Sequence, residues 1–293
     1  MATKPSIDII IPSWNARDLL EKHLPNTIKN SPEINKIIIV DDGSRDDTVE
    51  FLKKNYPEII CLSHKDNIGF TISVNIGANY SKADYIILLN NDVEPLENYI
   101  PKALDYFKDP KVFAVTFNEA ASSWPEVSFR GKLQYTRGED KTKPRHSAWA
   151  SGGSAIFNKK IWDEIGGLDE VYAPAYWEDI DIGWRAWKMG YKIIWAPETK
   201  VIHEHEASYS RKNQGYLNLI KQRNELLFNW RNITDKDLVA SHRSFLARHS
   251  LSHPGYFKVI ISAWMRNLSF KMNAHFSVTD AHVFKIVNTP YES

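Results

Sequence analysis

Short apolar runs alternate with amphipathic stretches through the first half of the chain. The apolar runs, rich in β-branched residues and leucine, predict buried strands at Ile7–Pro12, Lys36–Val40, Ile59–Ser63 and Tyr85–Leu89. The stretches between them have helical periodicity and predict helices at Ala16–Asn30, Asp46–Asn55 and Thr71–Ser81. Because strands and helices alternate with short connections, we expect an α/β fold whose parallel sheet is covered on both faces.

The pattern changes after the strand expected at Val112–Phe117. Residues 118–147 show little periodicity and contain several lysines and arginines. We expect a long irregular segment there, either a mobile lid over a site or a solvated insertion without a role. Beyond it, the pattern predicts a strand, two helices and a further strand at Ala155–Asn158, Lys159–Ile165, Ile180–Met189 and Tyr191–Ala196. From Ser208 on the periodicity is helical, which predicts a first domain at residues 1–207 and a helical C-terminal region at residues 208–293.

The stretch 256–271 is predicted to be an amphipathic helix. Its apolar face carries Phe257, Ile260, Ile261, Trp264 and Leu268, and its flanks carry Lys258, Arg266 and Lys271. Apolar residues with a tryptophan beside basic residues are typical of a helix that lies on an anionic bilayer. The alternative is that this face packs on the preceding helix, against Tyr216, Leu219, Leu227 and Trp230.

Composition narrows the class of protein. Of the 293 residues, 43% are hydrophobic and 25% charged, which is typical of a globular protein. The single cysteine, Cys61, excludes an intramolecular disulfide and a cysteine-built metal site, and it suits a cytoplasmic protein. Residues 200–293 hold 13 basic against 7 acidic residues, whereas the rest of the chain is net acidic. We expect no nucleic-acid partner, because no nucleic-acid-binding motif is present, and allow a peripheral contact with the cytoplasmic membrane face.

Polar side chains follow two of the predicted strands at the point where each ends. Asp41-Asp42-Gly43-Ser44 follow the second strand, and Asn90-Asn91-Asp92 follow the fourth. Either group alone is explained by turn chemistry, since these residues are common turn formers. Because ligands of open α/β sheets bind outside the carboxyl ends of the strands, the two groups together favour a binding site at that edge.

A third acidic group opens a predicted helix. Glu178, Asp179 and Asp181 fall within four residues, beside Tyr176 and Trp177. The helix dipole favours carboxylates at this position, but one would be enough. Three together indicate a base or a ligand whose proton affinity is tuned by its neighbours.

His203 ends the strand-like run Val201-Ile202-His203. Such a histidine is more often structural, but with Asp92 it could complete a divalent metal site of nitrogen and oxygen ligands. The sequence holds no G-x-x-x-x-G-K-[ST], no G-x-G-x-x-G after the first strand and no H-E-x-x-H. Kinase-like, dinucleotide-dependent and zinc-protease functions are therefore not expected.

Taken in order, these pieces resemble glycosyltransferase family 2. The residues that carry the resemblance are Ile10–Asn15, Val40–Asp46, Asn67–Phe70, Asn75, Gly77, Leu88–Asp92, Ser151–Gly153, Gly166–Asp169, Trp177–Asp179 and His203. They cover residues 7 to about 205 in the family's order. With its N-N-D sequence and the later Arg223-Asn224 helix, the chain is most similar to bacterial rhamnosyltransferase-like members.

The resemblance implies a fold and a reaction. The fold would be of GT-A type, a nucleotide-sugar-binding sandwich with a mainly parallel central sheet, here followed by a helical C-terminal part. The reaction would move a sugar from a nucleoside-diphosphate sugar, with inversion at the anomeric carbon. By family style, the donor would be deoxythymidine-diphosphate rhamnose or a uridine-diphosphate hexose. The acceptor would be a saccharide or a lipid-linked sugar used in cell-surface polysaccharide synthesis.

The resemblance also implies roles for individual residues. Donor binding would fall to Pro12, Trp14, Asp42, Asn67, Gly69, Asn91 and Asp92. Gly153, Trp177 and Glu178 would lie on the acceptor side, and Asp179 would be the general base. Asp92 and His203 would hold a divalent Mg²⁺ or Mn²⁺ that stabilises the leaving diphosphate. The family's D-x-D begins with an aspartate, whereas this chain has the neutral Asn90 there, so its metal affinity could be weaker.

Two other functions remain open from the sequence. A sugar nucleotidyltransferase would also need a pyrimidine pocket and a metal, but it would need a glycine-rich basic loop after the first strand as well. The segment Pro12-Ser13-Trp14-Asn15-Ala16 has no glycine and is followed by only one basic residue, Arg17. A non-catalytic carbohydrate-binding protein on the same fold is disfavoured by the presence of Asp92, Asp179 and His203.

Overall fold

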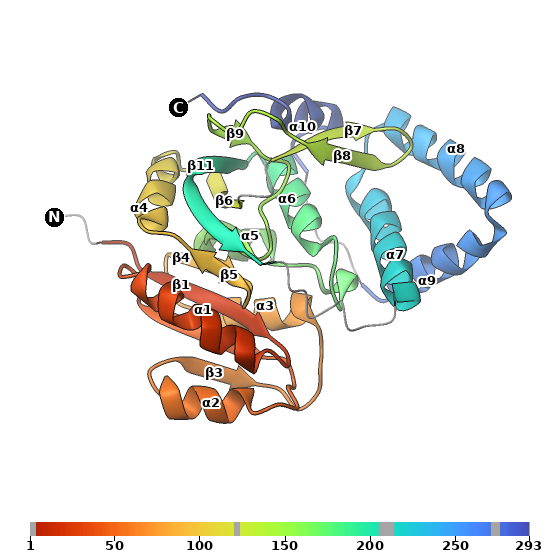
Figure 1. The fold of residues 1–293 in the computed structure, drawn as a ribbon. Helices are drawn as coiled ribbons and strands as arrows, with labels where there is room; N and C mark the ends of the chain where they lie inside the picture. The colour runs from red at the N-terminus through yellow and green to blue at the C-terminus, as the bar shows by residue number, and fades with distance from the viewer. Residues whose placement is uncertain (1–3, 120–123, 205–213, 271–275, 293) are drawn as a thin grey trace.

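The computed structural model describes residues 4–119, 124–204, 214–270 and 276–292, which fold around a central β-sheet (Figure 1). Within these ranges the strands of the sheet are β1 (Ile7–Ser13), β2 (Lys36–Asp41), β3 (Ile60–Ser63), β4 (Tyr85–Leu89), β5 (Val93–Pro95), β6 (Val112–Glu119), β9 (Arg145–His146), β10 (Ser154–Asn158) and β11 (Lys192–His203). Their order is β3-β2-β1-β4-β10-β6-β11-β5, with β9 paired to β11.

The first four strands form a parallel half of the sheet, as predicted. β1 pairs in parallel with β2 and β4, and β2 pairs in parallel with β3. The other half is mixed, because β10 runs antiparallel to β4 and β6, and β5 and β9 run antiparallel to β11. The expected parallel pairing is therefore confirmed in the first half and recurs in the second between β6 and β11, while the other pairs of the second half are antiparallel. Strands buried on both faces, such as β10, carry no alternation that would reveal their direction.

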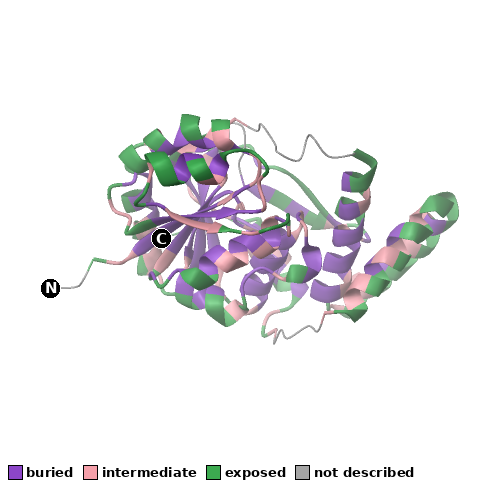
Figure 2. Ribbon diagram, turned by 90° about the horizontal axis from the view of Figure 1, so that it is seen from below, coloured by how far each residue is buried: buried purple, intermediate pink, exposed green. Residues whose placement is uncertain are grey.

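Alternate residues of the strands point into two separate cores. In β1, Ile10 faces one core, and Ile9 and Ile11 face the other. Three helices cover the Ile9 face: α1 (Arg17–Lys29), α2 (Thr48–Asn55) and α4 (Tyr99–Leu104). Three others cover the Ile10 face: α3 (Phe70–Tyr80), α5 (Lys159–Ile165) and α6 (Glu178–Lys188). Figure 2 shows the buried strands between these helical layers.

In the described part of the chain, short 3-10 helices stand between some of the helices and strands. They are η1 (Asp105–Lys108), η2 (Glu170–Tyr172) and η4 (Pro254–Tyr256). Helix η2 precedes the loop that leads to Glu178 and Asp179 at the acidic start of α6.

The prediction of an irregular segment at 118–147 is wrong for most of its length. The antiparallel hairpin of β7 (Pro125–Phe129) and β8 (Leu133–Arg137) occupies its centre, and β6 extends to Glu119. Val127 is buried, and its backbone exchanges two hydrogen bonds with the Asn288 side chain, at 3.0 and 2.9 Å. In β7 apolar and polar residues alternate, a strand pattern that the sequence analysis missed, whereas β8 is polar at most positions and gives no clear pattern. The part of the prediction at residues 120–123 lies outside the described residues.

The C-terminal region is helical, as predicted. It consists of α7 (Gln214–Asn232), α8 (Lys236–Ser252), α9 (Phe257–Leu268) and α10 (Asp280–Val287). Leu227 and Phe228 of α7 join the same core as Trp184 of α6, so these helices are continuous with the sheet's packing. The division at residue 207 stays a prediction. Among the described residues, no helix is both long and apolar enough to cross a membrane.

The orientation of α9 corrects one of the two alternatives stated above. Its buried residues are Val259 and Ala263, whereas Phe257, Ile261, Trp264 and Leu268 are more than half exposed. The alternative in which the predicted apolar face packs on α7 is therefore wrong, and only Ile260 of that face is partly buried. Arg266 also turns inward, since its guanidinium donates to the carbonyl oxygens of Glu170 and Val171. Lys271 lies outside the described residues.

Candidate functional site

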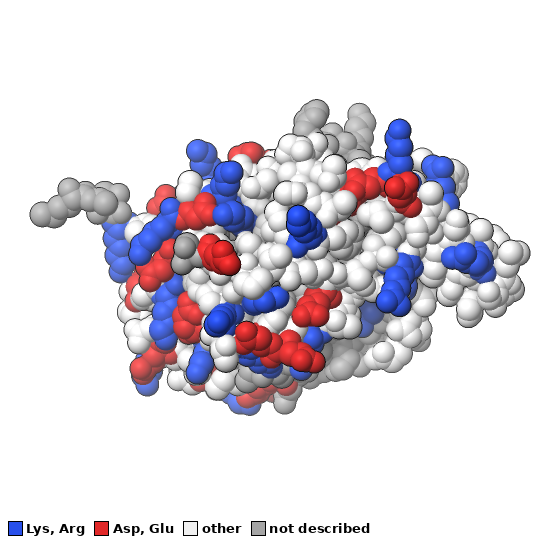
Figure 3. All heavy atoms as spheres, turned by 90° about the horizontal axis from the view of Figure 1, so that it is seen from above, with Lys and Arg blue, Asp and Glu red and all other residues white. Residues whose placement is uncertain are grey.

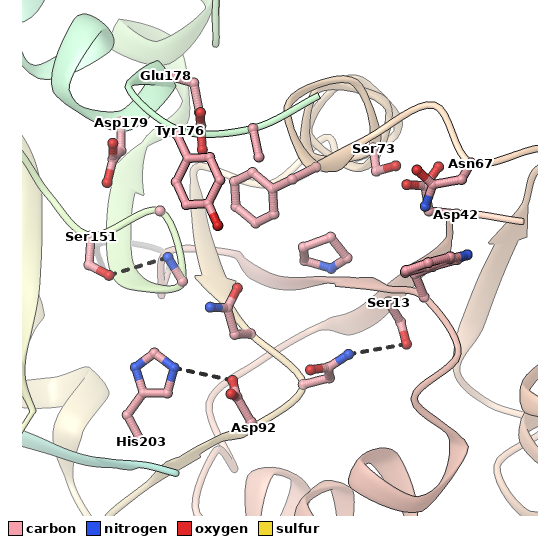
Figure 4. A pocket seen from close by; sticks show the side chains of 18 residues that line it. Ser13, Asp42, Asn67, Ser73, Asp92, Ser151, Tyr176, Glu178, Asp179 and His203 are labelled. Atoms are coloured by element: carbon pink, nitrogen blue, oxygen red, sulfur yellow. Dashed lines mark hydrogen bonds and ion pairs between the residues drawn. The ribbon is translucent and has the colours of Figure 1, made fainter. Parts of the chain in front are cut away.

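A cavity of about 350 Å³ opens at the carboxyl ends of β1, β2 and β4 (Figure 4). The polar and glycine loops that follow the strands form one wall, and the starts of α3 and α6 form the other. The lining residues are Pro12, Ser13, Trp14, Asp42, Asn67, Phe70, Ser73, Asn90, Asn91, Asp92, Ser151, Gly152, Gly153, Ala175, Tyr176, Glu178, Asp179 and His203. The strand-end groups expected to meet at this edge do lie together.

Most residues predicted from the sequence line this cavity. The donor set contributes Pro12, Trp14, Asp42, Asn67, Asn91 and Asp92, and the remaining set contributes Gly153, Glu178, Asp179 and His203. Gly69 and Trp177 are outside the lining. The sequence analysis missed Ser13, Phe70, Ser73, Ser151 and Tyr176 as lining residues. Their nearness to the quoted motifs was a usable signal, whereas nothing in the pattern showed which side chains point inward.

Asp42 organises the turn that leads into α3. Its Oδ1 accepts a hydrogen bond from the Ile68 N–H at 2.7 Å, and its Oδ2 accepts one from the Gly69 N–H at 2.9 Å. Burial raises the pKa of Asp42, although these backbone donors act against the rise. Gly69 has a φ of 96°, and a Cβ there would lie 2.6 Å from Pro174. The turn therefore requires a glycine at this position, and Gly69 supports the cavity without lining it.

Two neighbouring aromatic residues point in different directions before α6. Tyr176 and Trp177 both have positive φ, 75° and 77°, so the chain reverses sharply between them. Tyr176 lines the cavity, whereas the ring of Trp177 packs on Phe228 with centroids 5.3 Å apart. The structure thus does not place Trp177 in the cavity lining, contrary to the expectation from the sequence. Tyr176 is the aromatic residue on that side.

Helix α7 holds this reversing loop from outside the cavity. The Asn224 Nδ2 lies 2.7, 3.0 and 2.8 Å from the carbonyl oxygens of Tyr172, Ala175 and Tyr176. The Arg223 guanidinium donates to the carbonyl oxygen of Ala173 at 2.7 Å. Both side chains are buried, and burial lowers the pKa of Arg223 to about 10. The Arg223-Asn224 pair, noted only as a family-like feature, therefore fixes the loop that leads into the acidic group.

The three carboxyl groups of this acidic group do not all point the same way. Glu178 and Asp179 face the cavity, and burial raises the pKa of both, that of Asp179 to about 6. Backbone N–H groups, that of Ile180 among them, limit the rise for Asp179. Asp181 points away from the cavity and pairs with Arg185 at 2.7 Å. A carboxyl group that ionises near neutral pH and faces a cavity is suited to proton transfer.

His203 lies between two carboxylates. Its Nε2 is 3.2 Å from Asp92 Oδ1, and its Nδ1 is 3.2 Å from Glu119 Oε2. Burial alone would lower the pKa of His203, but the two carboxylates outweigh it and raise the pKa to about 9. Glu119 also accepts a hydrogen bond from the Ser154 hydroxyl. Sequence analysis missed Glu119, although a carboxylate at the end of a buried strand is a usable signal.

The pair of Asp92 and His203 fits a divalent cation. Two adjacent ligands of an octahedral ion, each about 2.1 Å from it, are about 3.0 Å apart. The observed distance of 3.2 Å between Asp92 Oδ1 and His203 Nε2 allows both atoms to bind one ion. Glu119 on the other ring nitrogen is the usual partner of a metal-bound histidine. Across the described ranges no three acidic, histidine or cysteine side chains form a complete ligand set, so the phosphates of a substrate or water would have to complete it.

Comparison with known sequences agrees with this geometry. The model of the family described as glycosyl transferase family 2 matches residues 8–166. The N-acetylglucosaminyl-diphospho-decaprenol L-rhamnosyltransferase of Mycobacterium tuberculosis is 22% identical in an alignment 260 positions long that covers 72% of this chain and 80% of that protein. The poly-beta-1,6-N-acetyl-D-glucosamine synthase of Staphylococcus aureus is 27% identical over 202 residues, 65% of this chain and 48% of the synthase.

Two solved structures share the fold. GalNAc-T7, solved with UDP, GalNAc and Mn²⁺, has a TM-score of 0.67 at 15% identity and aligns with 80% of this chain and 49% of its own. The mannosyltransferase PcManGT from Pyrobaculum calidifontis, solved with GDP-Man and Mn²⁺, has a TM-score of 0.57 at 14% identity, covering 92% and 75%. The fold is thus of GT-A type. From its motifs, its fold and its matching residues, the chain belongs to glycosyl transferase family 2 and is a glycosyltransferase.

Proposed function

We propose that the enzyme transfers a sugar from a nucleoside-diphosphate donor to a hydroxyl group of a saccharide or lipid-linked acceptor, with inversion at the anomeric carbon. The observation that carries this proposal is the position of Asp179. Its carboxylate lines the same cavity as Asp42 and Asp92, and burial raises its pKa to about 6. A base of that pKa is largely ionised at neutral pH and still takes up a proton readily.

The donor would lie along the strand ends. Pro12 and Trp14 offer apolar surface for a nucleoside base, and Asp42 keeps acceptor capacity toward a base N–H. Asn91 and Asp92, one strand over, would face the ribose and the diphosphate. Support comes from the two solved relatives of this fold, which hold UDP and GDP-Man.

A divalent metal is plausible for this fold, because both solved relatives contain Mn²⁺. We propose that Asp92 and His203 would hold a Mg²⁺ or Mn²⁺ ion here. Such an ion would supply positive charge beside the diphosphate as it leaves. His203 must lose its extra proton to bind it, so metal affinity at this site would rise with pH. Asn90 contributes no charge, which leaves Asp92 as the acidic ligand.

The chemical step would be a single displacement. The acceptor hydroxyl gives its proton to the carboxylate of Asp179 as its oxygen forms a bond to the anomeric carbon. The bond between that carbon and the donor phosphate oxygen breaks, and its electron pair leaves with the diphosphate. Attack from the face opposite the leaving group inverts the anomeric carbon. Burial raises the pKa of Glu178 well above the usual value, and in its protonated form Glu178 could donate a hydrogen bond to the acceptor.

We propose deoxythymidine-diphosphate rhamnose as the first donor to test and a uridine-diphosphate hexose as the second. The rhamnosyltransferase relative supports the first choice, and its printed name also supports a lipid-diphosphate-linked acceptor. The poly-beta-1,6-N-acetyl-D-glucosamine synthase relative, as named, supports a place in polysaccharide synthesis. An enzyme with such an acceptor would work at the cytoplasmic membrane face.

The experiment is a panel of nucleotide sugars incubated with short saccharide acceptors, with Mg²⁺, Mn²⁺ or chelator. We expect release of nucleoside diphosphate that depends on the acceptor, and a product of opposite anomeric configuration by NMR. Release of pyrophosphate from a sugar phosphate and a nucleoside triphosphate would identify a nucleotidyltransferase instead. Tight sugar binding without release of either product would identify a non-catalytic carbohydrate-binding protein.

A further inference from the structure

Helix α9 presents an apolar face that the described residues leave open. The exposed fractions are 52% for Phe257, 56% for Ile261, 57% for Trp264, 60% for Met265 and 67% for Leu268. At about 100° per residue, these five side chains fall within an arc of about 100° on the helix surface. Val259 and Ala263, on the opposite side, are the residues buried in the core.

Another strongly exposed apolar residue precedes α9 in the sequence. Leu251, at the end of α8 and just before η4, is 81% exposed. In Figure 2 the end of the molecule formed by α8 and α9 is mostly exposed or half-buried, unlike the sheet region. Several large exposed apolar side chains gathered on one helix face are unusual on a soluble monomer and are typical of a contact with a partner or a lipid surface.

The charge around this face indicates what it contacts. No aspartate or glutamate occurs between Leu238 and Thr279, whereas Arg243, Arg248 and Lys258 are exposed there. Lys258 lies at the edge of the apolar arc, about 20° beyond Met265 on the helix surface. In Figure 3 the outermost tip of the α8 end shows basic side chains and otherwise uncharged surface, whereas acidic and basic side chains occur together closer to and over the sheet side.

An anionic bilayer fits this combination better than a second copy of the chain. Two copies joined across a two-fold axis would bring the same basic surface together, so Lys258 and its neighbours would repel their equivalents. An anionic bilayer attracts these side chains and accepts the apolar ones between its headgroups. A tryptophan in the middle of the face is typical of the membrane interface.

We infer that the exposed face of α9 docks on an anionic lipid bilayer, with Phe257, Ile261, Trp264, Met265 and Leu268 inserted at the headgroup level. The inference goes beyond the proposed transfer reaction and holds whichever sugar is moved. Docking would bring a cavity that serves a membrane-borne acceptor to the surface where that acceptor is found.

Vesicle sedimentation tests this inference with the full chain. Vesicles of phosphatidylcholine alone are compared with vesicles that contain phosphatidylglycerol, at low and high salt. We expect the protein to sediment only with the anionic vesicles, and less so at high salt. Trp264→Ala with Leu268→Ala should lower the partition coefficient about tenfold or more. Lys258→Glu should lower it at least about fivefold. Tyr80→Ala, which changes a 46% exposed residue far from α9 in the sequence, is the matched control and should bind as the wild type does.

Three results would overturn the inference. The first is a protein that stays in the supernatant with every vesicle composition. The second is sedimentation that the Trp264 and Leu268 changes leave unaltered in a protein with an unchanged melting curve. The third is a concentration-dependent dimer, seen by light scattering, that those changes abolish, since a second copy would then occupy the face. Transfer to a soluble acceptor in the same variants separates this question from the proposed function, because α9 lines no part of the cavity.

Discussion

The imidazole of His203 is held at Nδ1 by Glu119, 3.2 Å away, while its Nε2 faces Asp92 at the same distance. Glu119 ends β6 and His203 ends β11, and the two strands are paired in parallel. The pairing of two strand ends therefore sets the ring's orientation. With a pKa of about 9, the ring holds a proton on each nitrogen at neutral pH. Once it loses one, a proton kept on Nδ1 beside Glu119 would leave the lone pair of Nε2 available on the side of the cavity.

We predict that Glu119→Gln weakens Mn²⁺ binding although Glu119 would not touch the ion. Loss of a carboxylate behind a metal-bound histidine lowers metal affinity about 10- to 100-fold. Calorimetry with Mn²⁺ and nucleoside diphosphate measures this directly. Glu97→Gln, a change of an exposed glutamate, is the control and should bind Mn²⁺ normally. Wild-type Mn²⁺ affinity in Glu119→Gln would contradict the assigned role.

We predict that Asp92 and His203 bind one ion between them. Asp92→Ala and His203→Ala should each weaken metal-dependent binding of the nucleoside diphosphate. The double change should cost less than the sum of the two, because either single change already breaks the ligand set. Equal binding of the nucleotide with chelator and with Mn²⁺ in the wild type would rule this site out.

We predict that Asp179→Asn keeps nucleotide binding and lowers turnover by about 10² or more, as expected for a lost general base. The wild-type kcat should fall as the pH drops below about 6, because burial raises the pKa of Asp179 to about 6 and the base must be ionised. The variant's residual rate should lose that acid limb. Near-normal turnover would move the role to Glu178, since Asp181 is committed to Arg185.

The carboxyl group of Asp179 should favour activity when it is ionised but stability when it is protonated. Its pKa is raised in the folded state, so the fold favours the protonated form, and that stability is lost as the pH rises through about 6. We therefore expect Asp179→Asn to melt at a higher temperature than the wild type at pH 8 and at a similar temperature at pH 4. A lower melting temperature at pH 8 would show that the ionised carboxylate is stabilised by its surroundings.

The strand ends were predictable because their chemistry is local. A run of apolar residues followed by Asp42 or Asp92 identifies a strand and the polar group at its end, and parallel pairing brings such ends to one edge. The directions of Tyr176 and Trp177 were not predictable. Both are aromatic, and only the packing of Phe228, some fifty residues later, decides which ring leaves the cavity.

The prediction of which face of α9 is buried failed for a related reason. Apolar residues occupy both sides of this helix, Val259 and Ala263 on one and Ile261 and Trp264 on the other. Periodicity therefore shows that the helix is amphipathic but does not say which apolar side meets the core. The contact with α7, made in three dimensions, decides it.

Lys188 and Asp280 form an ion pair that is wholly buried, with Nζ 2.9 Å from Oδ1, and it ties α10 to α6. We predict that Asp280→Asn lowers the free energy of unfolding by about 3–5 kcal/mol, because it leaves a buried ammonium without a counter-charge. Urea denaturation at pH 7 measures this loss. Asp237→Asn, at an exposed position, is the control and should change stability little.

The pH dependence of that pair follows from Asp280. Burial would raise its pKa, but the N–H groups of Asp235 and Thr234 and the Lys188 ammonium outweigh burial and lower it. The stability from this carboxylate is therefore present above its unfolded pKa of about 3.9 and is lost as the pH falls through the lower folded value. The advantage of wild type over Asp280→Asn should shrink in acid. An advantage that grows in acid would contradict this account.

The last prediction concerns Asn224, which has no exposed surface and holds the loop before α6 by the carbonyl oxygens of Tyr172, Ala175 and Tyr176. Asn224→Ala should lower kcat about tenfold or more with little change in donor KM, since a displacement of even about 1 Å at Asp179 is costly. Asn224→Asp discriminates between packing and donation. It keeps the side chain's size but sets a carboxylate against three carbonyl oxygens, so it should be at least as damaging as alanine. If Asn224→Asp were more active than Asn224→Ala, filling the space would be what matters, and the positioning role would fail. Asn218→Ala, at an exposed position on the same helix, is the matched control and should turn over as the wild type does.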